Sequence, residues 1–202
     1  MLFRRQCLIA SLVLAGSGLQ VRRAWAQAVE RASAFVQQTG DRLVAIVNGN
    51  LAPADKRRGL AQIMETSIDI DGIGRFCLGR FWRTASPDQQ KQFVAEFHEV
   101  LVTNIASKLG EYRGVRLTVQ RGRQQDDEVI VTTIVERPNN PQTTVDWIIE
   151  KPDSAPRIID VVAEGTSLRL TQRQDYASYL ARNNNDIDAL IKAMKQQVAQ
   201  SG

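Results

Sequence analysis

The chain has 202 residues, of which 43% are hydrophobic and 24% charged, with 26 basic and 22 acidic side chains. This length suits one domain that can bury a core of its own. Beyond the N-terminal segment there is no apolar run long enough to span a bilayer, no internal repeat and no long low-complexity stretch. Outside that segment, the sequence therefore gives no signal of a transmembrane bundle or a repeat protein.

The N-terminal segment resembles a cleavable export signal. Arg4 and Arg5 precede a mostly apolar run from Cys7 to Leu19, and small residues in Ala24-Trp25-Ala26 form a cleavage site. The alternative is an uncleaved anchor, but a run of about 13 residues falls short of the ~20 needed to span a bilayer. We therefore expect a signal peptide at 1–26 and one mature domain at 27–202. The arginine pair loosely resembles the twin-arginine motif, so the export route stays open.

Cleavage would change the charge of the chain. Removing the four arginines of residues 1–26 from the 26 basic residues leaves 22, which equals the 22 acidic residues. The mature chain would then be neutral, which gives no reason to expect a nucleic-acid partner and would limit sticking to anionic membranes. Cys77 is the only cysteine of the predicted mature chain, so no internal disulfide can form.

The first half of the mature chain reads as helices. Apolar residues at helical spacing predict helices over 27–48 and, after Asn48-Gly49-Asn50, over 53–68. The next segment, 69–83, is interrupted by glycines and dense in large side chains, which predicts a short irregular connector. Its aromatic residues either fill the core or form the floor of a ligand cavity.

A long amphipathic helix follows. Ser86, Pro87 and Gln89 form a capping box with proline at the first helical position. Large apolar residues then recur every four positions up to Gly110, which predicts a buried stripe of Phe93, Phe97, Leu101, Ile105 and Leu109.

The second half begins with a meander. Alternating or β-branched apolar residues predict strands over 115–119, 129–135, 143–149 and 158–164, with a polar loop at 121–127 and turns at 138–141 and 151–156. In the last strand we expect Ile159, Val161 and Ala163 to share the apolar face. Short connections make the four strands antiparallel.

The last strand leads directly into a helix. Gly165 ends the strand, and Thr166 and Ser167 offer hydroxyls that cap a helix beginning near Leu168. Three asparagines at 183–185 break the chain, and Asp186 caps a final helix. Together the elements predict an α+β fold. In this fold we expect a four-stranded, mainly antiparallel sheet with the N- and C-terminal helices on one face.

No catalytic or metal site is evident in the sequence. His98 is the only histidine, and it lies at the edge of the apolar stripe, where a structural role is expected. Cys77 and His98 would be the only thiol and imidazole for nucleophilic catalysis, without a third orienting group. Asp160 and Glu164 are ~13 Å apart along a strand, too far for a glycosidase pair, and are expected to be solvated or paired with arginines.

Four segments, in order, resemble the MlaC family of toluene-tolerance proteins. They are 76–97 with its glycine-arginine-phenylalanine-tryptophan run and Ser86-Pro87-Asp88-Gln89, then 159–168, 172–176 and 188–191. The resemblance covers most of 30–195. It departs from the family at Pro156-Arg157, Thr171-Gln172-Arg173 and Tyr176, which brings the hopanoid-associated HpnM branch into consideration.

The resemblance implies a non-enzymatic periplasmic carrier without a cofactor. Such a carrier holds phospholipid acyl chains, or a hopanoid, in an apolar cavity between helices and sheet. It exchanges lipid with an inner-membrane ABC transporter complex and an outer-membrane lipoprotein complex. The expected lining comprises large apolar side chains from both halves: Phe76, Phe81, Trp82, Phe97, Leu101, Ile105, Val131, Val145, Trp147, Ile149, Val161 and Leu168. The alternatives are an exported enzyme using Cys77 or His98 and a scaffold with a filled core.

Overall fold

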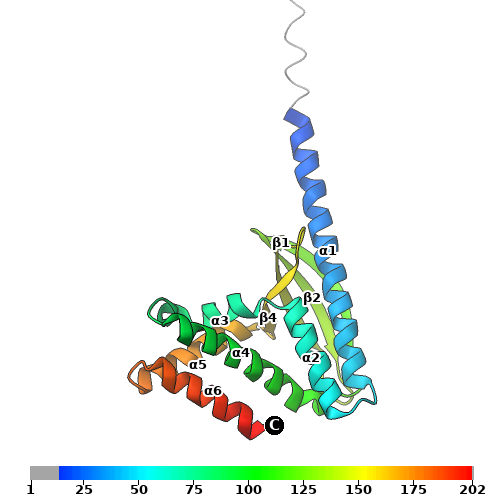
Figure 1. The fold of residues 1–202 in the computed structure, drawn as a ribbon. Helices are drawn as coiled ribbons and strands as arrows, with labels where there is room; N and C mark the ends of the chain where they lie inside the picture. Colours follow the sequence, from blue (N-terminus) through cyan, green and yellow to red (C-terminus); the bar gives the residue numbers. More distant parts are fainter. Residues whose placement is uncertain (1–13, 202) are drawn as a thin grey trace, which may run out of the picture.

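The computed structural model describes the backbone of residues 14–201 and the side chains of residues 25–200. The described chain has two layers, which Figure 1 shows side by side. One layer is an antiparallel sheet with the long helix α1 (Leu14–Asn48) beside it. The other is a group of helices that contains α3, α4, α5 and α6. The predicted α+β class is therefore confirmed.

The first helix is longer than the expected segment 27–48. It begins at Leu14 and passes without a break through the predicted cleavage position after Ala26. Residues 1–13 of the predicted signal peptide lie outside the described residues. Among the helices that are described, none has the length and hydropathy of a membrane span.

The segment 69–83, expected to be an irregular connector, is more regular than predicted. After α2 (Pro53–Ser67), Asp69 caps the nine-residue helix α3 (Ile70–Leu78) by accepting a hydrogen bond from the Gly72 amide at 3.1 Å. Gly79 then turns the chain with φ of +60°, a conformation that favours glycine, into the 3-10 helix η1 (Gly79–Arg83). The glycines within α3 are tolerated because tertiary packing holds the helix.

Helix α4 (Pro87–Lys108) begins as the sequence predicts. Ser86 Oγ accepts from the Gln89 amide at 3.1 Å and Gln89 Oε1 accepts from the Ser86 amide at 3.0 Å, which completes the capping box. The predicted apolar stripe is partly wrong. Phe93 and Phe97 of the stripe are fully buried, whereas Ile105 is 39% exposed. The other fully buried side chains of α4 are Val100, Val102 and Thr103, which lie outside the predicted stripe. A short 3-10 helix, η2 (Leu109–Tyr112), follows.

The sheet has the strand order β1-β2-β3-β4-β5, and each neighbouring pair is antiparallel. Its strands are β1 (Arg116–Gln125), β2 (Glu128–Glu136), β3 (Thr143–Glu150), β4 (Arg157–Ala163) and β5 (Thr166–Ser167). The four predicted strands are confirmed. The two residues expected only to cap the next helix also form a short fifth strand.

The loop predicted at 121–127 is wrong, because β1 continues to Gln125. The strand skips one position between Val119 and Arg121, where the register with β2 shifts. Beyond that bulge, exposed and partly buried residues still alternate. As an edge strand, β1 has one hydrogen-bonding side free, and polar side chains are typical there. Polar composition alone therefore gave a misleading signal.

A second bulge corrects the predicted face of β4. The register with β3 shifts between Ile148 and Ile149, so that Ile158 pairs with Ile149 and Val161 with Trp147. Ile158 and Val161 belong to the apolar cluster beside α1, whereas Ile159 belongs to a cluster with Ile130 and Ile148. Ile159 and Val161 therefore do not share a face, because one extra residue reverses the alternation.

The C-terminal helices follow the prediction closely. Ser167 caps α5 (Leu168–Arg182) by accepting from the Leu170 amide at 3.2 Å. Asp186 Oδ1 accepts from the Asp188 and Ala189 amides at 2.9 and 3.2 Å and so begins α6 (Ile187–Ser201). Helix α6 packs along α4 and so closes the helical layer.

Candidate functional site

The apolar interior of the described chain is divided into two main clusters. The helical cluster lies among α2, α3, α4, α5 and α6 and has the stacked rings of Phe93 and Phe97 at its centre, 6.0 Å apart. The sheet cluster lies between α1 and β2, β3 and β4, and includes Ala32, Val36 and Ile149. A smaller third cluster contains Ile130, Ile148 and Ile159.

The predicted lipid-contacting residues divide between these clusters. Phe97 is buried in the helical cluster, and four others pack against it: Phe76, Phe81, Trp82 and Leu101. Val131 and Ile149 are buried in the sheet cluster, and Trp147 and Val161 pack against it. Val145 is buried at the same sheet, paired with Thr133 and Ala163. Ile105 and Leu168, 39% and 52% exposed, belong to neither cluster.

Trp147 is fixed in the sheet cluster by its own hydrogen bond. Its indole Nε1 donates to Thr133 Oγ1 at 2.9 Å, and Thr133 Oγ1 donates to the Val145 carbonyl at 3.3 Å. The polar end of the ring is thereby satisfied, and its apolar surface stays available within the interior.

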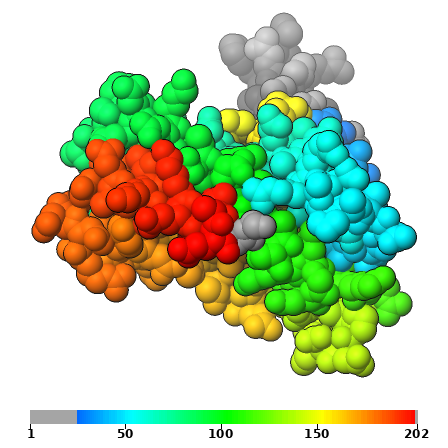
Figure 2. Space-filling view, turned by 60° about the horizontal axis from the view of Figure 1, so that its bottom comes forward, coloured from blue at the N-terminus to red at the C-terminus, as the bar shows by residue number. Residues whose placement is uncertain are grey.

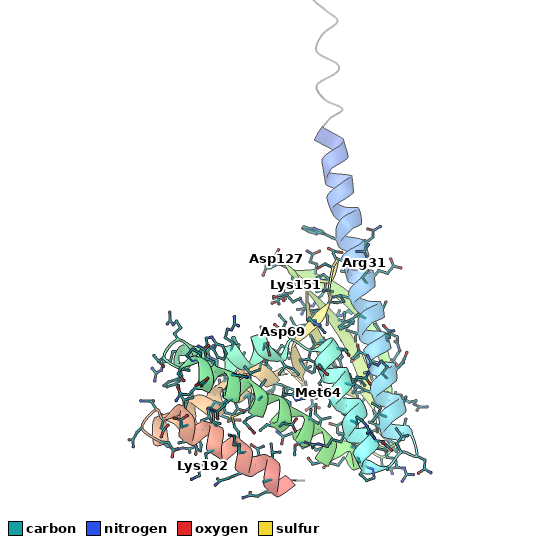
Figure 3. All side chains as sticks on the ribbon, viewed as in Figure 1. Arg31, Met64, Asp69, Asp127, Lys151 and Lys192 are labelled. Carbon is teal, nitrogen blue, oxygen red and sulfur yellow. The ribbon has the colours of Figure 1, made fainter. Side chains whose placement is uncertain are left out.

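One residue, Ile68, packs against both main clusters. It follows α2 and forms a parallel β-bridge with Ile158, while the next amide, of Asp69, donates to the Ile158 carbonyl at 3.0 Å. This junction joins the helical layer to the sheet, and Figure 3 labels Asp69 where the two layers meet. The sequence predicted Ile68 as the last apolar residue of the helix over 53–68 and did not single it out as a site residue. In the structure α2 ends at Ser67, and Ile68 is the extended residue that follows it.

A hollow of about 590 Å³ opens at this junction, between α2, α3 and α4. Its apolar lining consists of Ile68, Ile70, Val94 and Ala95. Its polar lining is mainly acidic and consists of Glu65, Asp69, Asp71, Glu96 and Glu99, with His98 and Arg157. The volume lies within the range of about 300–1,000 Å³ that is typical of ligand pockets. The hollow thus reaches the residue that the two clusters share.

A second hollow, also of about 590 Å³, lies where the end of α1, the start of α2 and the end of α4 meet. Lys56 and Arg57 line it, and both are already engaged. Lys56 Nζ donates to the Val47 carbonyl and Arg57 to Thr103 Oγ1, each at 2.9 Å, and Arg57 also pairs with Glu99. Neither hollow is lined by the predicted lipid-contacting residues.

The passage from β4 to α5 is held by a buried carboxylate. Asp160, 6% exposed, accepts from the Ser167 hydroxyl at 2.5 Å and from the Val161 and Arg169 amides at 2.8 and 3.1 Å. The Arg169 guanidinium lies 3.4 Å from its second oxygen. The pairing of Asp160 with an arginine is confirmed. Its carboxylate is used to fix the joint between sheet and helix.

Cys77 does not have the surroundings of a nucleophile. It is buried, and its thiol donates to the Arg169 carbonyl at 3.5 Å. Burial, opposed by the charge of Arg173, raises the pKa of the Cys77 thiol from 9.0 to about 12, so it stays protonated near neutral pH. His98 lies on α4 at the first hollow, with Nδ1 3.4 Å from Glu99. Among the described residues no cluster of histidine, cysteine and carboxylate side chains could hold a metal ion.

The fold is that of a known lipid-bound structure. A phospholipid-binding protein from Ralstonia solanacearum, solved in complex with a phospholipid, superposes with a TM-score of 0.71 over 84% of this chain and 97% of that one, at 23% identity. The toluene tolerance protein ttg2D of Pseudomonas putida is 25% identical over 144 residues, which span 70% of this chain and 67% of the relative.

The family follows from a direct match of the sequence. The family model described as MlaC protein matches residues 37–196, most of the chain. The chain belongs to the MlaC family.

Proposed function

We propose that this protein is a periplasmic lipid carrier, without catalytic activity, that holds the acyl chains of a phospholipid in its apolar interior. The observation that carries the proposal is the MlaC family match, joined to an interior divided into two apolar clusters that meet at Ile68. The phospholipid bound in the Ralstonia solanacearum relative of the same fold supports it.

The proposed binding mode places the acyl chains between the two layers. Separation of the clusters would expose the apolar side chains of both, including Phe97, Leu101, Trp147 and Val161, and the acyl chains would take the place of those contacts. Each methylene kept from water is worth about 0.8 kcal/mol, so a two-chain lipid can repay the separation. The hollow beside Ile68 is the proposed entrance, with the headgroup left at its polar rim.

The proposed partners follow from this role. A soluble carrier between two membranes needs a donor and an acceptor, for which we propose an inner-membrane ABC transporter complex and an outer-membrane lipoprotein complex. Export by a cleaved signal peptide at 1–26 fits the packing of α1. Trp25 is 54% exposed, whereas Ala28, Ala32 and Val36 are buried against the sheet. The lipid-binding domain would then be residues 27–202.

Lipid analysis of the purified protein tests the proposal. The protein is isolated from its own cell envelope fraction without detergent, and the extracted lipids are identified by mass spectrometry. We expect phospholipid in near-equal molar amount to protein. A hopanoid instead would assign the chain to the HpnM branch, whose consideration rests on the departures at Pro156-Arg157 and Tyr176. Protein that is always lipid-free would contradict the proposal.

A further inference from the structure

Aromatic and arginine side chains gather on one projecting turn of the helical layer. The turn comprises the end of α3 and the 3-10 helix η1, and α5 packs beside it. We name these residues the arginine–aromatic patch: Arg75, Phe76, Arg80, Phe81, Trp82, Arg83 and Arg173. Arg75, Arg80 and Arg83 are exposed, whereas Phe81 and Trp82 are half-buried. Figure 2 shows the segment around η1 and the start of α4 as a green lobe that projects at the upper left.

The guanidinium groups of the patch lie over aromatic rings. Arg75 lies 5.1 Å from the centre of the Trp82 ring and Arg80 lies 4.8 Å from that of Phe81. Arg169 and Arg173 lie 4.9 and 4.8 Å from the centre of Phe76. Arginine–ring pairs occur about once per 70–80 residues, so four in one turn and the adjoining helix are a concentration. A guanidinium held over a ring is preorganised, and its N–H edges can still donate to an anion.

The positive charge of the patch is not neutralised within the described chain. Arg169 is paired with Asp160 at 3.4 Å. By contrast, no described carboxylate lies within the 4.0 Å ion-pair distance of Arg75, Arg80, Arg83 or Arg173. Arg173 is used once, since its Nη1 donates to the Phe76 carbonyl at 3.0 Å. Acidic side chains gather elsewhere, at the first hollow. A mature chain with zero net charge would therefore still carry a local positive surface.

We propose that the arginine–aromatic patch is a docking surface for an anionic phospholipid bilayer. Guanidinium groups match lipid phosphates, and a positive surface is attracted to anionic headgroups. The aromatic residues favour a bilayer over an acidic protein as the partner. On a protruding turn, the tryptophan ring can enter the headgroup region while the charged end of the neighbouring arginine stays near the phosphates. This inference does not rest on the carrier proposal, because it concerns a surface and not the interior.

Vesicle flotation tests the inference. The probes are vesicles of phosphatidylcholine alone and of equal parts phosphatidylcholine and phosphatidylglycerol. The triple variant Arg75→Gln/Arg80→Gln/Arg83→Gln is compared with Arg58→Gln/Arg116→Gln/Arg121→Gln, which removes the same charge from exposed positions elsewhere. One basic residue near an anionic surface changes partitioning about fivefold. We expect the patch variant to lose about a hundredfold in partitioning to the anionic vesicles, and the control to lose far less.

A second variant covers loss of folding in the triple variant. Arg83→Glu changes a side chain that has no hydrogen bond or ion pair among the described residues, and it should weaken anionic binding more than Arg58→Glu does. Equal binding by patch and control variants, or no binding of wild type to anionic vesicles, would overturn the inference. If the wild-type protein does not bind vesicles and the triple variant expressed in cells has lost its bound lipid, the patch is assigned to an acidic protein partner. Because flotation reads the surface and lipid extraction reads the interior, the two proposals can fail separately.

Discussion

Buried polar side chains in and beside the helical layer are satisfied to different degrees. Asp160 has three hydrogen-bond donors and a guanidinium, and Cys77 has the Arg169 carbonyl. Tyr176 is only 6% exposed, and its hydroxyl has no hydrogen-bond partner among the described residues. Its ring meets those of Phe93 and Phe97 edge to face, at 5.7 and 6.3 Å, so packing holds it in place.

The unpaired hydroxyl predicts that Tyr176→Phe stabilises the lipid-free protein. A buried polar group without a partner costs about 1–3 kcal/mol, and phenylalanine keeps the ring contacts. We expect a gain of about 1 kcal/mol, which raises the Tm by about 2–4 °C for a chain of this size. Thermal unfolding measures the change. A lower Tm in the variant would mean that the hydroxyl has a partner in solution.

Cys77 predicts a loss of stability at alkaline pH. Its pKa is raised by burial from 9.0 to about 12, so the thiol is neutral in both folded and unfolded chains below pH 9. Between pH 9 and 12 the unfolded chain loses the thiol proton before the folded chain does. The free energy of unfolding therefore decreases, by up to about 1.4 kcal/mol per pH unit. Burial also raises the pKa of Tyr176, which acts in the same direction.

Denaturant unfolding below and above pH 9 measures this effect. Cys77→Ala should reduce the pH dependence, whereas its effect on packing shifts stability at every pH alike. The native thiol should also resist alkylation until the protein unfolds. An unchanged pH dependence in Cys77→Ala, or rapid alkylation of the folded protein, would show that the thiol is not buried as described.

For single residues, the sequence predicted local hydrogen bonding better than it predicted which side chains are buried. The hydroxyl of Ser167 and the carboxylate of Asp186 cap helices as expected, because capping depends on neighbours in the chain. The lipid-contacting set was less predictable. Apolar character alone does not distinguish Ile105, which is exposed, from Val100, which is buried. The difference arises from the fold, which places Val100 in the helical cluster and leaves Ile105 outside it.

Among the elements, helix α4 was the most predictable and the bulged strand pairs were the least. A capping box is a local signal and fixes the start of α4. Bulges are not local. The shifts at Val119/Arg121 and Ile148/Ile149 arise from pairing between strands, so neither the continuation of β1 nor the face of Ile159 could be read from alternation.

The capping box predicts a measurable stability term for α4. Ser86→Ala leaves the Gln89 amide without its side-chain acceptor and should cost about 1 kcal/mol. Ser107→Ala is a matched control near the other end of the same helix, where the hydroxyl only donates to the Asn104 carbonyl and alanine is the better helix former. Chemical denaturation compares the two variants. Equal stability of both would show that the cap contributes nothing.

For the whole molecule, the order of helices and strands predicted the α+β class, but not the division of the core. The predicted lining was pooled from both halves of the chain, whereas the structure separates it into a helical and a sheet cluster. Only the tertiary fold places Ile68 between them, beside a hollow of about 590 Å³. We propose that lipid enters where these two clusters meet.

The most direct test compares bound lipid in two matched variants by native mass spectrometry. Ile68 packs against both clusters, whereas Ile73, also partly buried, packs against the helical cluster alone. An amide at position 68 places a polar group at the proposed entrance, so Ile68→Asn should lose most of its bound lipid, and Ile73→Asn, similarly destabilised, should keep it. Equal lipid content in the two variants, with both folded, would contradict entry between the two clusters.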